Sequence, residues 1–489
     1  MFLCYVTCAK DISDYNQSNM AHCGDSNVTI RQTPIQAFYA GQSIFITGGT
    51  GFLGKILIEK LLRSCPDVSK IYVMVRSKKD KSAATRLDEI FESPVSISII
   101  FHLAANIRFN NDIKSATVLN VVSTRAVLNL AKCMPNLKSF IHVSTIYTNC
   151  LVKHGEERFY KYLIKPEEFI TLVQTSSESM INETLSRNIS QWPNSYTFTK
   201  AIAEIVVKNN GESLPIGIFR LPAGTARGMG GQLSLFDRNL APVSKGLLRF
   251  IMCNSDCKSS VTPVDITINA LIARAWDVFN QPQRRGDNML IYNYVSTNDA
   301  PLTYGDFFFY AQLSYQKYPI KSCYWVPTLT DPKQSYIYNM HLVRPPITCF
   351  NYRFLWKMHR YSTKVYETLS VSMKKYSCKR YFTCFRMWKL YKRIHDYCNS
   401  VEYFLVREWT YTDNNVHAMW QSMSENDQLL FNFNLKGFNW LKHVDNIIKG
   451  MRLYLFKEDL STLEASRIKW KRLYWIHHAT KFVFIFIVV

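Results

Sequence analysis

Several patterns that define common protein classes are missing from this 489-residue chain. Its 13 cysteines include no C-x-x-C pair, and no histidine spacing typical of a zinc site accompanies them. We therefore predict no bound metal and a reduced, intracellular protein. The chain also has no internal repeat and no recognisable nucleic-acid-binding module, so nucleic acid is not an expected partner.

Acidic side chains are scarce relative to basic ones. Aspartate and glutamate number 37 against 59 lysines and arginines, which leaves a formal net charge of +22. A field of this sign favours anionic partners, which include phosphorylated cofactors, phosphorylated substrates and membranes that contain anionic lipid. Charge alone does not choose among these partners.

Long apolar runs are absent as well. Residues 1–10 have too short an apolar run, and no basic segment, for a signal peptide. The apolar end at 482–489 has eight residues, whereas a spanning helix needs about 20. A basic and aromatic stretch at 371–395 offers a second contact, because such a helix either lies on a membrane surface or packs with a solvated basic face.

What the chain does have is a glycine turn between a strand pattern and a helix pattern. Residues 43–46 are apolar and predict a strand, and 55–62 predict an amphipathic helix. Glycines let the backbone approach a pyrophosphate, and the following helix N-terminus offers free N–H groups to it. The spacing is G-x-x-G-x-x-G, and strand and helix on either side favour a dinucleotide site. The predicted cofactor-binding residues of this turn are Gly48, Thr50, Gly51, Phe52, Leu53 and Gly54.

The next predicted strand, 70–76, bears on the choice of cofactor. It ends in Arg76, where NAD-specific sites carry an acidic residue for the ribose 2′-hydroxyl. A cation there pairs with a 2′-phosphate, so NADPH is favoured over NADH. The alternative is a solvated basic loop with no role in cofactor choice.

Two further predicted strands end in small or hydroxyl side chains. The strand at 99–106 ends in Ala104 and Ala105, which leave room for the cofactor. The strand at 140–147 carries Ser144 and Thr145, and ligands of open α/β sheets bind where such strands end. Thr145 is the first choice for a hydroxyl that binds the substrate carbonyl, with Ser144 second. The alternative is a strand-end cap of the next turn.

Two side chains that share a helix face complete the candidate site. Tyr196 and Lys200 are at i and i+4 in Tyr-Thr-Phe-Thr-Lys. A nearby ammonium stabilises a phenolate, so the tyrosine can pass a proton to a substrate oxygen. We expect Lys200 to hold the nicotinamide ribose as well, which makes it a catalytic and a cofactor-binding residue.

These motifs resemble those of extended short-chain dehydrogenases/reductases, and more narrowly of the alcohol-forming fatty acyl-CoA reductases. The resemblance rests on segments spread over residues 35–480, which are 38–41, 44–54, 59–66, 101–109, 194–204, 403–409 and 431–455. It implies reduction of a fatty acyl-CoA by NADPH to a primary alcohol, with Tyr196, Lys200 and Thr145 in catalysis. It also implies association with a membrane, of the peroxisome or the endoplasmic reticulum.

One departure from that family concerns the stretch after Pro94. Several dozen residues normally precede the strand that holds His102, but here Pro94 runs almost directly into Ile99. The missing stretch should contain a helix, a strand and contacts near the adenine. Two alternatives therefore stay open: a catalytically impaired relative that binds dinucleotide or lipid, and a different extended reductase that acts on a sterol or a nucleotide sugar.

The expected architecture is α/β, with a Rossmann-type doubly wound parallel sheet and a smaller, mainly helical C-terminal domain. The predicted organisation is a polar lead-in at 1–34, the reductase domain at 35–320, an irregular basic and aromatic region at 321–395, a C-terminal reductase-family domain at 396–475 and an apolar tail at 476–489. Within the reductase domain we expect a helix at 266–278 and a strand at 289–295.

Overall fold

The structure is a computed structural model. It describes residues 2–6, 32–75, 97–107, 109, 112–162, 164–177, 179–181, 191–225, 240–248, 251–327 and 379–488. The chain divides into two compact units, each assembled from three stretches of sequence. Unit 1 comprises 1–225, 260–300 and 409–438, and unit 2 comprises 226–259, 301–408 and 439–489. The units therefore do not follow the expected boundaries near residues 320 and 396.

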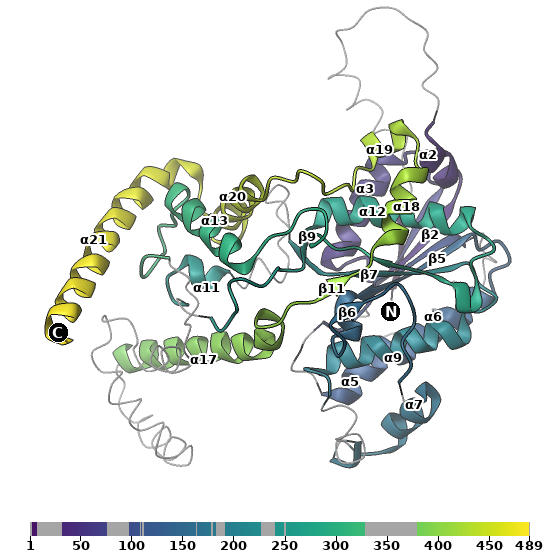
Figure 1. Ribbon diagram of the computed structural model, residues 1–489, viewed down its shortest axis with the longest axis horizontal. Helices are drawn as coiled ribbons and strands as arrows, with labels where there is room; N and C mark the ends of the chain where they lie inside the picture. Colours follow the sequence, from purple (N-terminus) through teal and green to yellow (C-terminus); the bar gives the residue numbers. More distant parts are fainter. Residues whose placement is uncertain are drawn as a thin grey trace, which may run out of the picture. The chain divides into compact units, whose positions relative to one another are not determined.

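Unit 1 is built on a seven-stranded sheet (Figure 1). Six strands run parallel and the edge strand β1 is antiparallel to β3. The order is β1-β3-β2-β4-β5-β7-β10, so the chain moves outward from β2 to β3 and then crosses to the other side at β4. This reversal between β2 and β4 is the switch point at which doubly wound sheets bind ligands. The strands are β1 (Phe2–Val6), β2 (Ser43–Thr47), β3 (Lys70–Val75), β4 (Ile97–His102), β5 (Ser139–Thr145), β7 (Ile216–Leu221) and β10 (Leu290–Asn293).

The edge of the sheet next to β3 differs from the usual doubly wound order. In the usual doubly wound order a third parallel strand lies beyond the second, next to the position of β3. Here β1 takes that edge position, with Phe2 opposite Val75. Within the predicted lead-in at 1–34, these five residues form a strand because the open edge of β3 offers them backbone hydrogen bonds.

Helices cover both faces of the sheet (Figure 1). One face carries α3 and α12, and α2 and α18 lie against α12. The other carries α5, the π-helical turn η2, α6 and α9, and α7 packs on α5 and α9. The bounds are α2 (Pro34–Tyr39), α3 (Phe52–Ser64), α5 (Ile113–Thr117), η2 (Val118–Val122), α6 (Ser123–Lys132), η3 (Ile146–Asn149), α7 (Pro166–Thr175), α9 (Ser195–Asn210), α12 (Val264–Asn280) and η4 (Gly286–Asn288).

Local sequence explains where two helices of unit 1, α9 and α2, begin. Asn194 precedes α9 in extended conformation, and its side chain accepts a hydrogen bond from Thr197 N–H. Thr33 and Gln36 form a reciprocal capping box at α2, with Pro34 in the first turn. Along the sheet, every residue of β2, β4 and β5 is buried. Strands buried on both faces read as continuous apolar runs, which is why they were predictable.

Residues 409–438 belong to unit 1, although residues 301–408 of unit 2 precede them in the sequence. They contain β11 (Thr410–Tyr411), α18 (Asn414–Ser422) and α19 (Glu425–Leu430). β11 pairs in parallel with β6 (His154–Gly155), and a further small sheet joins β8 (Ala223–Thr225) to β9 (Val261–Pro263). Lys60 of α3 donates to the carbonyl of Leu430 at 2.8 Å. This segment is therefore an integral part of unit 1.

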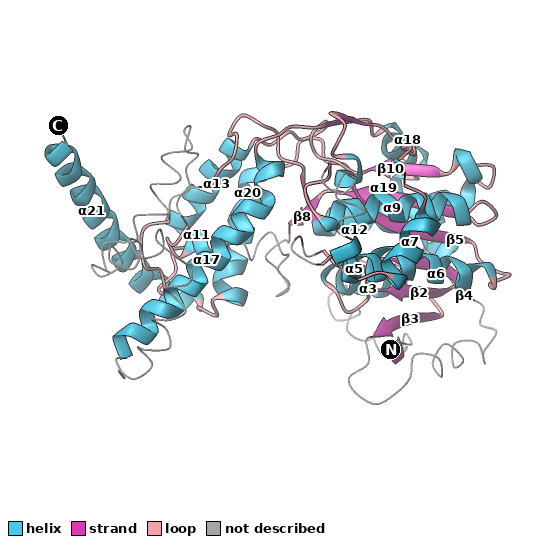
Figure 2. Cartoon of the chain, turned by 90° about the horizontal axis from the view of Figure 1, so that it is seen from below, coloured by secondary structure: helices cyan, strands magenta, loops and turns pink. Residues whose placement is uncertain are grey.

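The described part of unit 2 is helical and irregular, apart from one bridge between Lys258 and Thr303. Helices α13 and α20 lie side by side (Figure 2), and Ser314 of α13 donates to Asp445 of α20 at 2.6 Å. Arg452 is fully buried and pairs with Glu458 at 3.3 Å. The elements are α11 (Ala241–Ser244), α13 (Tyr304–Lys317), α17 (Lys379–Leu405), α20 (Trp440–Gly450), η5 (Met451–Leu455), η6 (Leu460–Thr462) and α21 (Leu463–Val488).

The predicted apolar tail is the last part of a 26-residue helix, α21. Within the described residues, no helix of either unit combines the length and the apolar character that crossing a bilayer requires. Most side chains of the basic and aromatic stretch 371–395 lie outside the described residues, and its backbone from Lys379 onward belongs to α17.

Candidate active site

The glycine turn lies at the switch point between β2 and β4. Gly48 has φ +71°, a left-handed conformation that favours glycine, and a Cβ there would lie 2.9 Å from the backbone nitrogen of Ala104. A Cβ on Gly54 would lie 2.5 Å from the carbonyl oxygen of Gly48. The turn thus folds tightly onto both the end of β4 and the first turn of α3. These are the two conditions under which a backbone can approach a pyrophosphate, so the residues fit a dinucleotide.

The other predicted cofactor residues surround this turn. Gly51 is the N-cap of α3, and Phe52 and Leu53 open that helix with N–H groups available for an anion. Thr50 is exposed, and Ala104 and Ala105 are half-buried just beyond β4. All of them therefore lie just beyond the carboxyl ends of β2 and β4. Arg76 lies outside the described residues, so the basis for choosing between the two dinucleotides stays a prediction.

The structure brings Tyr196 and Thr145 together. Tyr196 lies in the first turn of α9 and Thr145 ends β5, and the Thr145 hydroxyl is near enough to influence the Tyr196 phenol. Burial raises the pKa of the Tyr196 phenol to about 12, and the interaction with Thr145 opposes that shift. The phenol is therefore held protonated at neutral pH, which a proton donor to a substrate oxygen requires.

Lys200 lies one turn after Tyr196 and is fully buried. Its ammonium donates to the carbonyl of Val143 at 2.7 Å. Burial lowers the pKa of Lys200 to about 8, and the negative charge of Glu204 partly restores it. The expected lowering of the Tyr196 pKa by Lys200 is absent from this arrangement, in which burial dominates the pKa of both groups.

Ser144, the second choice for the substrate hydroxyl, is engaged elsewhere. Its hydroxyl donates to Glu204 at 2.6 Å, and Glu204 also accepts two hydrogen bonds from Arg220, at 2.7 and 3.0 Å. All three side chains are buried. The Ser144 hydroxyl is thus held by the Glu204–Arg220 ion pair. The contact with Tyr196 thus belongs to Thr145.

The sequence prediction missed this buried ion pair, although a signal was present. Glu204 follows Lys200 by four residues, so the helix face that carries Tyr196 and Lys200 continues into a carboxylate. Arg220 is the next-to-last residue of β7, whose other residues carry no polar side chain, and a buried cation there requires a partner. Arg220 also donates to the carbonyls of Glu156 and Arg158, which fixes the loop beyond β6.

The C-terminal segment of unit 1 reaches the same end of β5. Trp409 packs edge-on against Tyr147, with ring centroids 5.8 Å apart, and its indole N–H donates to the carbonyl of Cys150 at 3.2 Å. Burial raises the pKa of the Tyr147 phenol, which is hydrogen-bonded to Ser260. Residues more than 250 positions downstream thus buttress the turn that follows Thr145.

Glu157 ties the same segment to the edge of the sheet. Its carboxylate accepts backbone N–H groups of Asn293, at the end of β10, and of Asn415, at the start of α18, at 3.3 and 2.9 Å. Burial is the main cause that raises the pKa of Glu157 to about 7, although both hydrogen bonds oppose that rise.

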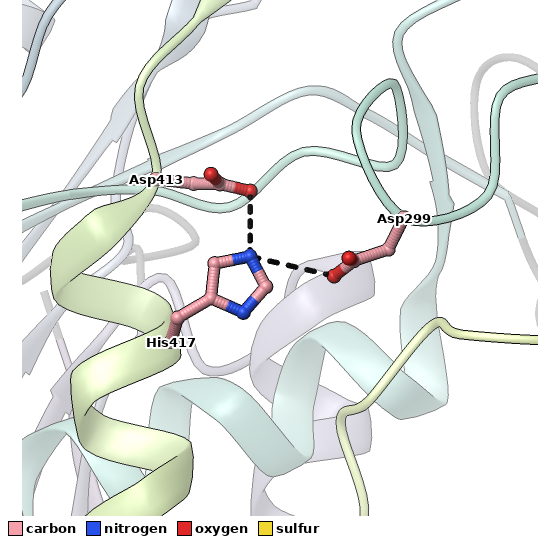
Figure 3. A group of neighbouring side chains, drawn as sticks. All are labelled: Asp299, Asp413 and His417. Atoms are coloured by element: carbon pink, nitrogen blue, oxygen red, sulfur yellow. Dashed lines mark ion pairs between the residues drawn. The ribbon is translucent and has the colours of Figure 1, made fainter.

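A histidine between two carboxylates joins α18 to the loop after β10 (Figure 3). Nε2 of His417 lies 3.5 Å from an oxygen of Asp413 and 3.6 Å from an oxygen of Asp299. Burial raises the pKa of Asp413. The three side chains offer ligand-type atoms within 4.8 Å of one another. The expectation of no metal stays a prediction.

Comparison with known proteins agrees with this arrangement. An NAD-binding family model described as male sterility protein matches residues 46–97 and 95–271, and a second model of the same description matches 348–458. The first match comes in two pieces that meet at residues 95–97, where the sequence analysis placed a missing stretch.

Curated relatives match almost the whole chain. The fatty acyl-CoA reductase wat of Drosophila melanogaster is 29% identical over 95% of this chain and 93% of its own length. The human fatty acyl-CoA reductase 2 is 30% identical over 91% of this chain and 90% of its own length. Such similarity extends through both the nucleotide-binding unit and the C-terminal region.

A solved structure supports the fold. The terminal R domain from the myxalamid PKS-NRPS biosynthetic pathway is 16% identical, with a TM-score of 0.51, and the match covers 86% of this chain and 92% of that domain. Because the doubly wound fold, the family models and the curated relatives all agree, the chain belongs to the fatty acyl-CoA reductase family.

Proposed function

We propose that this protein reduces long-chain fatty acyl-CoA to a primary alcohol with NADPH and releases CoA. The observation that carries the proposal is the placement of the Thr145 hydroxyl beside the Tyr196 phenol. This pair stands at the carboxyl end of β5, in the dinucleotide-binding unit of a chain from the fatty acyl-CoA reductase family. The curated relatives support the acyl-CoA substrate through their names.

In the first reduction the thioester carbonyl oxygen accepts hydrogen bonds from Tyr196 and Thr145. These donors stabilise the negative charge that develops on that oxygen. Collapse of the tetrahedral intermediate breaks the carbon–sulfur bond, so CoA leaves as a thiolate and an aldehyde remains. In the second reduction Tyr196 gives its proton to the aldehyde oxygen, which forms the alcohol, and regains a proton from solvent.

The cofactor supplies one hydride in each of the two reductions when it is bound. The turn from Gly48 to Gly54 and the N-terminus of α3 would hold its pyrophosphate. Lys200 would bind the nicotinamide ribose, and its buried ammonium has a single protein acceptor among the described residues, the carbonyl of Val143. The preference for NADPH rests on Arg76, for the electrostatic reason that its cation attracts a 2′-phosphate.

The test is a product assay on the purified full chain. The protein is incubated with NADPH and a C16 or C18 acyl-CoA, and alcohol and aldehyde are measured by gas chromatography. We expect alcohol as the main product, and about 10²–10⁴-fold less product from a Tyr196→Phe control. Absence of both products from folded wild-type protein that binds NADPH would contradict the proposal.

One observation favours a second candidate, a relative that binds dinucleotide or lipid without turnover. The family model is interrupted at residues 95–97, between the second and the next parallel strand of the sheet. Tight NADPH binding, measured by the fluorescence of the nicotinamide ring, together with no acyl-CoA-dependent oxidation of NADPH, would favour this candidate over the first.

We also propose that the protein attaches to the surface of a peroxisomal or endoplasmic reticulum membrane. The support comes from α21 in unit 2, on which Trp475, Ile476 and Ile468 are exposed. The apolar side chains would enter between the lipid headgroups. Basic residues of the same helix, such as Lys471 and Arg472, would then attract the anionic headgroups. Recovery of the full chain in the soluble fraction at low salt without detergent would contradict this proposal.

A further inference from the structure

A buried histidine occupies the switch point of the sheet without belonging to the reacting groups. His102 is the last residue of β4, is 1% exposed, and lies beside Thr47, the last residue of β2. Thr47 immediately precedes the glycine turn. The hydrogen bonds of His102 connect the two halves of the active site.

Both ring nitrogens of His102 are hydrogen-bonded. Nδ1 lies 2.8 Å from the Thr47 hydroxyl, and Nε2 lies 3.0 Å from the Thr124 hydroxyl on α6. The Thr47 hydroxyl also accepts the backbone N–H of Ala104 at 3.2 Å. The Thr124 hydroxyl donates to the carbonyl of Asn120 at 2.7 Å.

These partners fix the direction of every bond. The single hydrogen of the Thr124 hydroxyl goes to Asn120, so Thr124 can only accept from His102, and Nε2 must carry a hydrogen. Burial lowers the pKa of His102 to about 3, so the ring is neutral and Nδ1 is an acceptor. Thr47 therefore donates to Nδ1 while it accepts from Ala104.

The relay continues into the catalytic helix. Asn120 lies in the π-helical turn η2, a distortion that often marks functional sites. Its side chain accepts from Asn106 N–H at 2.7 Å and donates to the hydroxyl of Thr199 at 2.9 Å. Thr199 lies on α9 between Tyr196 and Lys200. The loop after β4, which carries Ala104, is thus connected to the helix of the proton donor.

We propose that His102 is a positioning residue that holds the cofactor turn and the Tyr196–Lys200 helix in register through this directed relay from Ala104 to Asn120. His102 touches no reacting atom, and its two ring nitrogens bind different parts of the site. The bond at Nδ1 fixes Thr47 and hence the glycine turn. The bond at Nε2 fixes Thr124, Asn120 and hence α9. The two bonds should therefore affect cofactor binding and turnover separately.

Replacing His102 with asparagine or with glutamine can test its two hydrogen bonds one at a time. Asparagine places its amide at the position of Nδ1, and glutamine places its amide near the position of Nε2. His102→Asn should keep the link to Thr47 and lose the link to Thr124, and His102→Gln should do the reverse. Thr124→Val removes the second link without altering His102, so it serves as an independent variant if His102→Asn fails to fold.

The readouts are the NADPH dissociation constant from nicotinamide fluorescence, the turnover number with acyl-CoA, and the midpoint of thermal unfolding. Because one hydrogen bond corresponds to roughly tenfold, His102→Asn and Thr124→Val should lower turnover about tenfold with nearly normal NADPH affinity. His102→Gln should weaken NADPH affinity about tenfold, with a smaller effect on turnover at saturating NADPH.

His142 provides a matched control. It is the neighbouring buried histidine on β5, with its ring centroid 5.4 Å from that of His102, but neither of its nitrogens has a hydrogen-bond partner within the described part of the chain. His142→Leu removes a histidine of the same depth without breaking a hydrogen bond, so NADPH affinity and turnover should stay within about twofold.

The proposal fails if His102→Asn and His102→Gln have the same effects, or if both change affinity and turnover only in proportion to lost stability. It also fails if all variants match the wild type. The turnover measurement rests on the proposed reductase function, whereas the contrast in NADPH affinity between the two amide variants does not. A wild type that binds NADPH but never turns over would contradict the proposed function alone, and that contrast would still decide the role of His102.

Discussion

Glu157→Gln should change the pH dependence of stability, because this carboxyl group titrates far from its ordinary range. Its pKa is raised from 4.5 to about 7, chiefly by burial. A group whose pKa is higher in the folded state stabilises that state fully below the unfolded pKa, and this contribution is lost as the pH rises through the folded value. Wild-type protein should therefore lose stability from this group between about pH 4.5 and pH 7.

The magnitude follows from the same two pKa values. Linkage gives a loss of about 2–3 kcal/mol between pH 5 and pH 8 for a shift of this size. Glutamine has no charge to lose, so the variant lacks this pH-dependent part. The two carboxylate oxygens accept from two different N–H groups, and an amide has one acceptor oxygen, so the variant also loses one hydrogen bond. That loss costs about 1–3 kcal/mol at every pH and cancels when two pH values are compared.

The assay is the unfolding midpoint of wild type and variant by scanning fluorimetry at pH 5 and at pH 8. The variant should gain on the wild type by about 4–6 °C between the two pH values, at roughly 2 °C per kcal/mol for a unit of this size. Glu168→Gln, at an exposed carboxylate that pairs with Lys165, serves as the control and should show no such gain. A difference between wild type and Glu157→Gln that is the same at both pH values would refute the reasoning.

Four further outcomes are expected. Tyr196→Phe should keep NADPH binding while turnover falls by about 10²–10⁴, and near-normal turnover would place the proton donor elsewhere. Arg76→Asp should shift the ratio of NADPH to NADH affinity by about ten- to hundredfold towards NADH, and an unchanged ratio would mean that this side chain faces solvent. Arg220→Met leaves the charge of Glu204 buried without its main partner and should destabilise the protein by about 3–5 kcal/mol in chemical denaturation, whereas a neutral result would show that water reaches the carboxylate. Removal of residues 473–489 should let high salt release the protein from membranes while activity on soluble acyl-CoA persists; release of the full chain by the same salt would exclude an apolar anchor.

The sequence predicted the elements that carry a repeating pattern. The strand at 43–46 and the helix at 55–62 correspond to β2 and α3, and the helix at 266–278 corresponds to α12. Continuous burial makes such strands apolar throughout, and a helix that covers a sheet shows a regular apolar stripe. The predicted strand at 289–295 corresponds to β10 for the same reason.

What the sequence could not predict depends on partners far along the chain. The sequence of residues 2–6 does not predict an edge strand, because these residues form one only by pairing with the open edge of β3. The choice of Thr145 over Ser144 follows from the Glu204–Arg220 ion pair that holds the Ser144 hydroxyl, and Arg220 lies opposite Ser144 only because β5 pairs with β7. The assignment of 409–438 to the nucleotide-binding unit likewise rests on contacts such as Trp409 with Tyr147.

The division of unit 1 into three stretches of sequence affects how the protein must be made. Its last stretch ends at residue 438, so the nucleotide-binding unit cannot close until about nine-tenths of the chain has left the ribosome. Until then β6 lacks the strand that pairs with it from 256 residues downstream, as the bond between His154 and Thr410 marks. Contacts of such long sequence separation form slowly. We therefore expect nascent chains that stop before Trp409 to depend on chaperones, and protease resistance of the unit to appear only late in synthesis.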